Sequence, residues 1–170
     1  MAMPKKLKNF NAFSDGESFL GQIKSVTLPT LTRKMEDWRG GGMSGPVKVD
    51  FGQEGLEIKF TYGGLMQQVL KQYGLTTHDG LGLRFAGAYQ RDDTGAVDAV
   101  EVIVRGRHSE IELGDAEAGE DGEFVATTTC SYFKYVVNGQ TLIEIDLMNM
   151  IENVGGVDRL AEQRSAIGAS

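Results

Sequence analysis

Residues 124–146 read FVATTTCSYFKYVVNGQTLIEID, and this stretch decides the fold class. Phe124 to Val137 is a run rich in β-branched and aromatic residues, and Thr141 to Asp146 is a second, shorter run. Asn138-Gly139 lies between them, and this pair is a strong hairpin signal because both residues tolerate a positive φ. The stretch therefore predicts two antiparallel strands joined by a tight turn.

The residues before this hairpin predict another long pair of strands. Leu83 to Arg91 leads through a turn at Gly95 into Val97 to Leu113. The apolar residues of the second strand change from even to odd positions on passing Gly106. That change of phase predicts a bulge at or near Gly106.

Shorter strands are predicted nearer the N-terminus. Ile23 to Arg33 is β-branched but contains Pro29, which belongs at a strand end, an edge or a bulge because it lacks an amide donor. Val47 to Phe51 and Leu56 to Tyr62 alternate apolar and polar residues, the period of half-buried strands. An Asp-Gly pair at residues 15–16 predicts a further hairpin.

Two helices complete the expected elements. Leu65 to Tyr73 has apolar residues at helical spacing between Gly64 and Gly74, which predicts a central amphipathic helix. Asp158 is expected to cap a short C-terminal helix that stops at Gly168. The pattern as a whole predicts a mainly β domain, a sandwich or barrel with one helix packed on it.

The composition agrees with a single domain over residues 1–170. Hydrophobic residues make up 41% of the chain and charged residues 24%, as in ordinary globular proteins. The chain has 23 glycines but only 3 prolines, which indicates many turns and many short elements. No run approaches the roughly 18 apolar residues of a membrane helix, so we expect no membrane insertion.

Two segments stand apart from this pattern. Residues 1–9 form a basic N-terminal arm, and Met35 to Pro46 is a glycine-rich segment without a sustained period, which predicts a mobile loop. The loop carries Trp38, the only tryptophan. Two interpretations of Trp38 stay open: it folds back on its own core, or the loop becomes ordered against another subunit.

The sequence carries no catalytic or metal-binding motif. His78 and His108 are the only histidines and lie far in sequence from Cys130, the only cysteine, so we expect no metal, no cofactor and no enzyme activity. The chain starts without the apolar core of a secretory signal, and a single cysteine needs no oxidising compartment. Synthesis in a reducing cytoplasm is expected.

The charge is acidic. The formal net charge of −7 argues against tight nucleic-acid binding, which needs a basic face to displace counterions. Between Gly114 and Gly122 the chain holds carboxylates but no Lys or Arg, which predicts a solvated acidic loop.

Five stretches resemble the major tail tube protein of temperate contractile-tailed bacteriophages. They are Met1–Leu7 (MAMPKKL), Lys24–Lys34 (KSVTLPTLTRK), Arg84–Gly95 (RFAGAYQRDDTG), Val104–Arg107 (VRGR) and Gly156–Leu160 (GVDRL). The tube protein of R-type phage-tail-like bacteriocins is similar but less close. The resemblance runs from the first residue to the last turn, with the stretches in the same order.

This resemblance implies a structural protein with two packed antiparallel sheets and a helix. It implies rings of six copies whose strands join edge to edge into a barrel, and rings that stack into a tube. The implied partners are other copies, the contractile sheath, the tape-measure protein in the lumen, and the baseplate and tail-terminator proteins. The resemblance also implies that DNA passes through without specific binding and that the tube belongs to the virion tail, assembled in the host cytoplasm.

Three groups of residues are candidates for the interfaces of such a tube. The ring-stacking arm and loop comprise Met3, Leu7, Glu36, Asp37, Trp38, Arg39, Gly40, Gly41, Gly42 and Met43. The acidic loop, a candidate for facing the sheath, comprises Asp115, Glu117, Glu120 and Asp121. The candidate lumen lining comprises Thr127, Thr129 and Ser131, on one face of the long strand.

Several alternatives stay open from sequence. The same fold serves tubes of bacteriocins and secretion machines, and a monomeric small-molecule-binding β-barrel or an enzyme is the rival from another class. The sequence does not separate an infectious phage from a prophage or a bacteriocin, and tube length is set by another protein.

Overall fold

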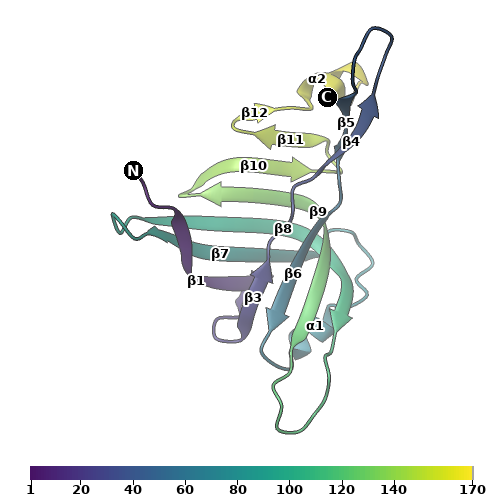
Figure 1. Cartoon of the computed structure of the whole chain (residues 1–170). Coiled ribbons are helices and arrows are strands. Elements are labelled where there is room, and N and C mark those ends of the chain that lie inside the picture. The colour runs from purple at the N-terminus through teal and green to yellow at the C-terminus, as the bar shows by residue number, and fades with distance from the viewer. Residues whose placement is uncertain (170) are drawn as a thin grey trace.

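The computed structural model describes residues 1–169, and most of them lie in β-strands (Figure 1). The strands are β1 (Lys5–Ser14), β2 (Glu17–Ser18), β3 (Ile23–Thr27), β4 (Arg33–Trp38), β5 (Val47–Gln53), β6 (Leu56–Tyr62), β7 (Leu81–Arg91), β8 (Val97–Glu112), β9 (Phe124–Val137), β10 (Gln140–Asp146), β11 (Ile151–Val154) and β12 (Val157–Asp158). The helices are α1 (Gln67–Lys71) and α2 (Ala161–Ala166).

Hydrogen bonds join ten of the strands into one antiparallel network. Its order is β12-β11-β10-β9-β8-β7-β1-β2, and β6 and β3 branch from β9. The remaining two strands, β4 and β5, form a separate antiparallel ribbon that projects from one end of the molecule (Figure 1). The long predicted hairpin at Asn138-Gly139 is confirmed as the β9–β10 connection.

Two long strands build both layers of the fold. The first half of β9 pairs with β6, and its second half pairs with β10. The first part of β8 pairs with β7, whereas its last residues pair only with β9. The network therefore forms two packed antiparallel layers, as predicted, and the sheet is not closed within one chain (Figure 1).

The bend between the layers lies at Gly106, where the sequence predicts a bulge. Arg105 pairs with Tyr132 but Gly106 pairs with Cys130, so Ser131 is an extra residue in β9. A Cβ added at Gly106 would lie 2.0 Å from the carbonyl oxygen of Thr129. Only glycine allows this close approach of the two backbones, and the prediction of a bulge is confirmed.

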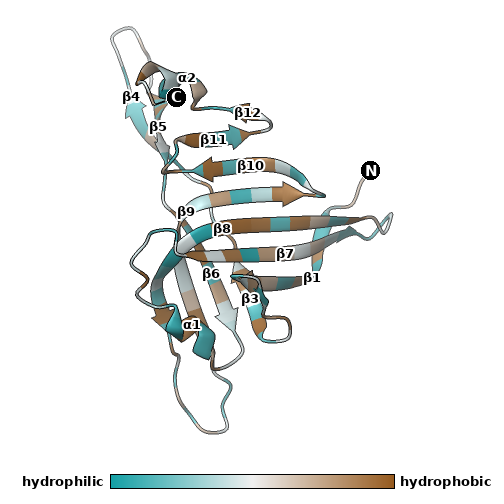
Figure 2. Ribbon diagram, turned by 180° about the vertical axis from the view of Figure 1, so that it is seen from behind, coloured by the Kyte–Doolittle hydropathy of each residue, from teal (hydrophilic) through white to brown (hydrophobic). Residues whose placement is uncertain are grey.

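The core lies between the layers and centres on aromatic rings. Tyr62 on β6 makes edge-to-face contacts with Phe19 at 5.2 Å and with Phe124 at 6.0 Å between ring centroids. Burial raises the pKa of the Tyr62 phenol. Figure 2 shows apolar bands along β7 and β8. Phe85 on β7 and Val104 on β8 are both buried.

A chain of polar side chains crosses this core. His108 on β8 is 7% exposed, its Nδ1 lies 2.9 Å from Thr128 Oγ1, and its Nε2 lies 3.1 Å from Gln72 Oε1. Gln72 Nε2 donates in turn to Ser14 Oγ at 2.9 Å. Because an amide oxygen only accepts, Nε2 of His108 carries the proton. Burial lowers the pKa of His108, so the imidazole is neutral at pH 7. The chain of hydrogen bonds links Gln72, which directly follows α1, to β1, β8 and β9.

The helices are shorter than the sequence predicts. α1 covers residues 67–71 rather than 65–73, and α2 begins after Leu160 rather than after Asp158. The carboxylate of Asp158 accepts a hydrogen bond from the amide of Leu160 at 3.2 Å and forms an ion pair with Arg164 at 2.8 Å. These contacts make a turn before the helix instead of a cap. Within residues 1–169 neither helix is long and apolar enough to span a membrane.

Two boundaries of the expected flexible segments are also wrong. Residues 5–9 of the expected arm belong to β1 and pair with β7, with an irregularity in register between Leu7 and Asn9. Residues 35–38 of the expected loop belong to β4, where pairing with β5 supplies the hydrogen bonds that the sequence pattern does not reveal.

Replacing Gly106 by Ala tests the role of the bulge. Because the new methyl group would collide with the backbone of β9, we expect Gly106→Ala to lower the free energy of unfolding by about 3 kcal/mol. The measurement is urea unfolding of the purified chain. Gly55→Ala is the matched control, since a Cβ there meets nothing within 4 Å. Equal stability of the two variants would contradict this account of the fold.

Candidate assembly interfaces

The β4–β5 ribbon, residues 33–53, has one apolar face. Trp38 pairs with Val47 and Glu36 with Val49 across the ribbon, so alternation places Trp38, Val47, Val49 and Phe51 on the same side, with Glu36 among them. These four side chains are 61%, 53%, 38% and 61% exposed, respectively. The interpretation that Trp38 folds back on its own core is therefore wrong. The opposite face carries Met35 and the ion pair of Lys48 with Asp37 at 3.0 Å.

The tip of the ribbon is a compact turn rather than an irregular loop. The amide of Gly40 donates to Met43 Sδ at 3.0 Å, and Arg39 Nε donates to the carbonyl oxygen of Met43 at 3.2 Å. The Trp38 ring lies over Gly40, 3.6 Å from the position where a Cβ would stand. Gly42 has a φ of +84°, which only glycine adopts freely. These contacts set the orientation of the Arg39 and Trp38 side chains at the tip.

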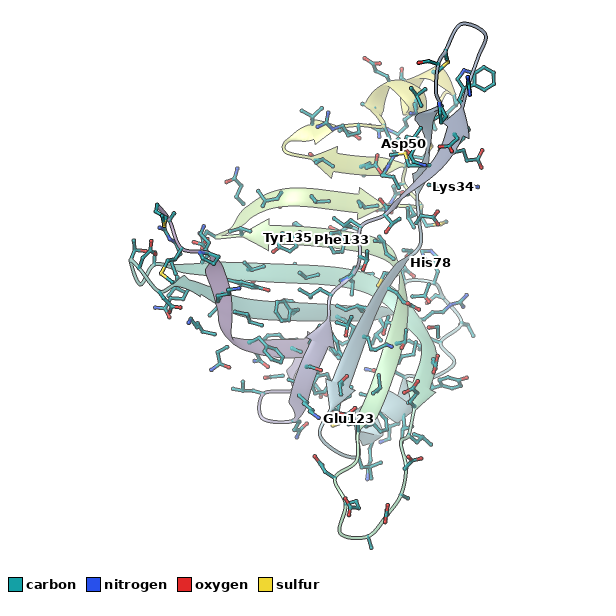
Figure 3. All side chains as sticks on the ribbon, in the orientation of Figure 1. Lys34, Asp50, His78, Glu123, Phe133 and Tyr135 are labelled. Carbon is teal, nitrogen blue, oxygen red and sulfur yellow. The ribbon has the colours of Figure 1, made fainter. Side chains whose placement is uncertain are left out.

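An ion-pair cluster fixes the base of the ribbon to the sheet. Arg33 on β4 pairs with Asp50 on β5 at 2.9 Å and with Glu152 on β11, which is 7% exposed. The hydrogen bond that Arg33 donates to Asp50 raises the pKa of Arg33 and lowers the pKa of Asp50. Figure 3 labels Asp50 where the ribbon meets the sheet. No sequence signal joins residues so far apart along the chain.

The N-terminal arm lies away from the ribbon. The amide of Met3 donates to Asp93 Oδ2 at 3.2 Å, and Lys8 pairs with Asp92 at 2.8 Å, which holds the arm on the β7–β8 turn. Met3 and Leu7 are 49% and 42% exposed. Both views of the ribbon diagram place the N-terminus far from the ribbon tip (Figures 1 and 2). The two parts of the expected ring-stacking site are therefore not brought together within one chain.

The acidic loop connects β8 to β9 at the end of the molecule opposite the ribbon (Figure 1). Gly114 starts it with a φ of +78°, and a Cβ there would lie 2.4 Å from the carbonyl oxygen of Glu123, so glycine is needed for the close approach. Glu123 pairs with Lys24 at 2.5 Å. The four carboxylates of the predicted site are all exposed, and among residues 1–169 none of them forms an ion pair: Asp115, Glu117, Glu120 and Asp121.

Next to this loop lies a groove that the sequence analysis did not anticipate. The distal groove, as we call it, has a volume of about 490 Å³. Leu65, Leu70 and Leu113 line it and are 71%, 38% and 66% exposed, while Phe124 forms its buried floor. Glu120, Asp121 and Glu123 stand on its acidic side. Its residues come from three separate parts of the chain, so no local pattern reveals it.

The three candidate lumen residues differ in accessibility. Thr127 is 8% exposed, Thr129 is exposed, and Ser131 Oγ lies 2.7 Å from His78 Nδ1 (Figure 3 labels His78). The bulge displaces Ser131 from the row that Thr127 and Thr129 share. Within one chain, Thr129 alone presents a hydroxyl that is both open and unengaged by another side chain.

The outer face of the β7–β8 pair carries mixed charges. Arg84 lies 4.3 Å over the ring of Phe13 and 3.7 Å from Glu101.

The single cysteine is not poised for catalysis. Burial raises the pKa of the Cys130 thiol to about 12, so the thiol is protonated at neutral pH. Across residues 1–169 no three His, Cys, Asp or Glu side chains gather as metal ligands.

Comparison with known proteins assigns the chain to a family. The profile of the family described as phage tail tube protein FII matches residues 4–168. The chain belongs to this family. The rival expectation of an enzyme or a ligand-binding barrel is therefore wrong, and the role of this tail tube chain is structural. Tail tube proteins are components of the virion.

Individual relatives agree along the whole chain. The tail tube protein of Escherichia phage P2 is 49% identical over 171 residues, which is 99% of each chain. The major tail tube protein of Serratia phage KSP20 is 41% identical over 153 residues, 89% of this chain and 88% of the relative.

Solved structures of distant sequence share the fold. A component of an extracellular contractile injection system, solved as its PVC sheath-tube complex in the extended state, matches with a TM-score of 0.54 at 11% identity. The match covers 76% of this chain and 88% of that one. The sheath/tube terminator of the same kind of system matches with a TM-score of 0.55, also at 11% identity, over 77% of this chain and 94% of that one.

Proposed function

We propose that copies of this tail tube chain close into rings of six, and that the rings stack into the inner tube of a contractile tail. The observation that carries the proposal is the apolar face of the ribbon, which the chain cannot bury by itself. A contiguous apolar surface of this kind on a soluble protein marks a site of association. A contact between two unlike surfaces closes a ring when it is repeated by rotation. It builds a filament when it is repeated along an axis.

The open sheet supports ring closure. Its path ends at β2 and β12, and a sheet with free edges presents unpaired backbone groups to other chains. Joining the edges of neighbouring copies would pair these groups and close a barrel around a central lumen. A barrel made between subunits explains why the sheet stays open within one of them.

The net charge supports passage of DNA through such a lumen. A ring of chains with a formal charge of −7 each is strongly acidic, and an acidic wall repels phosphates instead of holding them. Thr129 remains our candidate for the polar lining. The tape-measure protein would fill the lumen first, and the baseplate and tail-terminator proteins would meet the two tube ends. Assembly would take place in the host cytoplasm.

The acidic loop is proposed to face the sheath. Asp115 and Glu117 are exposed, unpaired among residues 1–169, and outside the distal groove, so they are free to attract a basic element of the sheath.

Replacing Trp38 by Ala tests the stacking role of the ribbon. We expect Trp38→Ala to reduce tubes in electron micrographs at least tenfold at equal protein concentration, because it removes the largest apolar group of the ribbon face. The free energy of unfolding should change by less than about 0.5 kcal/mol, since the side chain is exposed. Leu20→Ala, at a 68% exposed leucine on another loop, is the control and should leave tubes intact. Normal tubes from Trp38→Ala would contradict the proposal.

Neutralising the outer part of the acidic loop tests the sheath contact. Asp115→Asn with Glu117→Gln, co-produced with the sheath protein, should lower the fraction of sheathed tails because an electrostatic attraction is lost. The number of bare tubes should stay unchanged. Glu54→Gln, on the exposed β5–β6 connection, is the control. A wild-type fraction of sheathed tails from the double variant would remove the acidic loop from the sheath interface.

A further inference from the structure

We infer that the distal groove of one copy receives the ribbon of the next copy along the tube, an inference that rests on the proposed stacking of rings. The ribbon comprises residues 33–53, and the groove is lined by Leu65, Leu70, Leu113 and Phe124 with acidic residues beside them. The partner is therefore a second copy of this chain, and the contact joins two unlike surfaces.

The two surfaces lie at opposite ends of the molecule. The ribbon projects from one end, while α1 and the β8–β9 loop form the other, and both views agree on this separation (Figures 1 and 2). The ribbon of a chain therefore does not reach its own groove. A contact between opposite ends of successive copies repeats in one direction, as the growth of a tube requires.

Both surfaces are apolar and open. The ribbon offers Trp38, Val47, Val49 and Phe51, all at least 38% exposed, and the groove offers three leucines in the same range of exposure. The core of the chain covers neither set of side chains. Their burial against each other removes apolar surface from water at both ends of every copy, which favours association.

The ribbon face carries the exposed Glu36, but the charge at its tip, on Arg39, is opposite to the charges beside the groove. Arg39 at the tip donates to a carbonyl oxygen, and no carboxylate within residues 1–169 forms an ion pair with its guanidinium. On the groove, Glu120 and Asp121 also form no ion pair in the described part of the chain, whereas Glu123 pairs with Lys24 directly. The hydrogen bond with Glu123 raises the pKa of Lys24, and the charge of Asp121 adds to this effect. A guanidinium set against two carboxylates that form no ion pair favours this docking and fixes its direction.

Disulfide cross-linking tests the contact in assembled tubes. The variant carries Gly41→Cys at the ribbon tip, where a Cβ meets open space, and Leu113→Cys in the groove. Mild oxidation of its tubes should give a ladder of covalent oligomers on a non-reducing gel. Either single variant, and the control pair Gly41→Cys with Thr94→Cys on the β7–β8 turn, should run as monomer. The native Cys130 is 4% exposed and does not take part.

A charge exchange tests the same contact without cysteines. Arg39→Glu should reduce tube yield at least tenfold, and adding Glu120→Lys and Asp121→Lys to it should restore at least half of the wild-type yield. Restoration, or a ladder from the double-cysteine tubes, supports docking in the groove. Tubes that show neither a ladder nor rescue overturn this inference and leave ring stacking intact. If the wild-type chain forms no tubes, the proposed function fails and this inference fails with it.

Discussion

The chain folds into two packed layers but leaves one apolar face of the β4–β5 ribbon exposed to solvent. The way the ribbon is attached and the groove at the opposite end of the molecule can both be understood from this constraint. Trp38, Val47, Val49 and Phe51 face away from the core, although the ribbon itself is firmly attached through Arg33 to Asp50 and Glu152. A buried carboxylate such as Glu152 is costly unless paired, so the base of the ribbon is held in one direction. The structure thus presents an apolar surface rigidly and at a distance from the core.

The bulge at Gly106 gives this arrangement its geometry. Because β9 changes partner there, β10 and β11 lie beside the base of the ribbon at one end. At the other end the β6–α1 connection, α1 and the β8–β9 loop build the groove. The long strands connect the two ends through an antiparallel network. The fold therefore sets the separation between the two surfaces that successive copies would use.

Much of the fold could be predicted from sequence because its signals are local. The Asn138-Gly139 turn, the alternation in β6 and the phase change at Gly106 all depend on neighbouring residues. The sequence pattern predicts only one of the two ribbon strands. Val47 to Phe51 alternates, whereas the glycines that follow Met35 to Trp38 favour a loop over the matching strand. The distal groove and the Arg33 cluster join residues distant in sequence, so no pattern predicted them. The tail tube function came from long stretches of family resemblance, since the residues that carry it have no catalytic chemistry.

The most direct test of the central claim is acrylamide quenching of Trp38, the only tryptophan of the chain, in free subunits and in assembled tubes. In the free chain the indole is 61% exposed and should be readily quenched. The account predicts that assembly lowers the quenching constant severalfold and shifts the emission to shorter wavelength, because the ribbon face becomes buried against another copy. Equal quenching and unchanged emission in tubes would show that the ribbon face stays in water, and would contradict the claim.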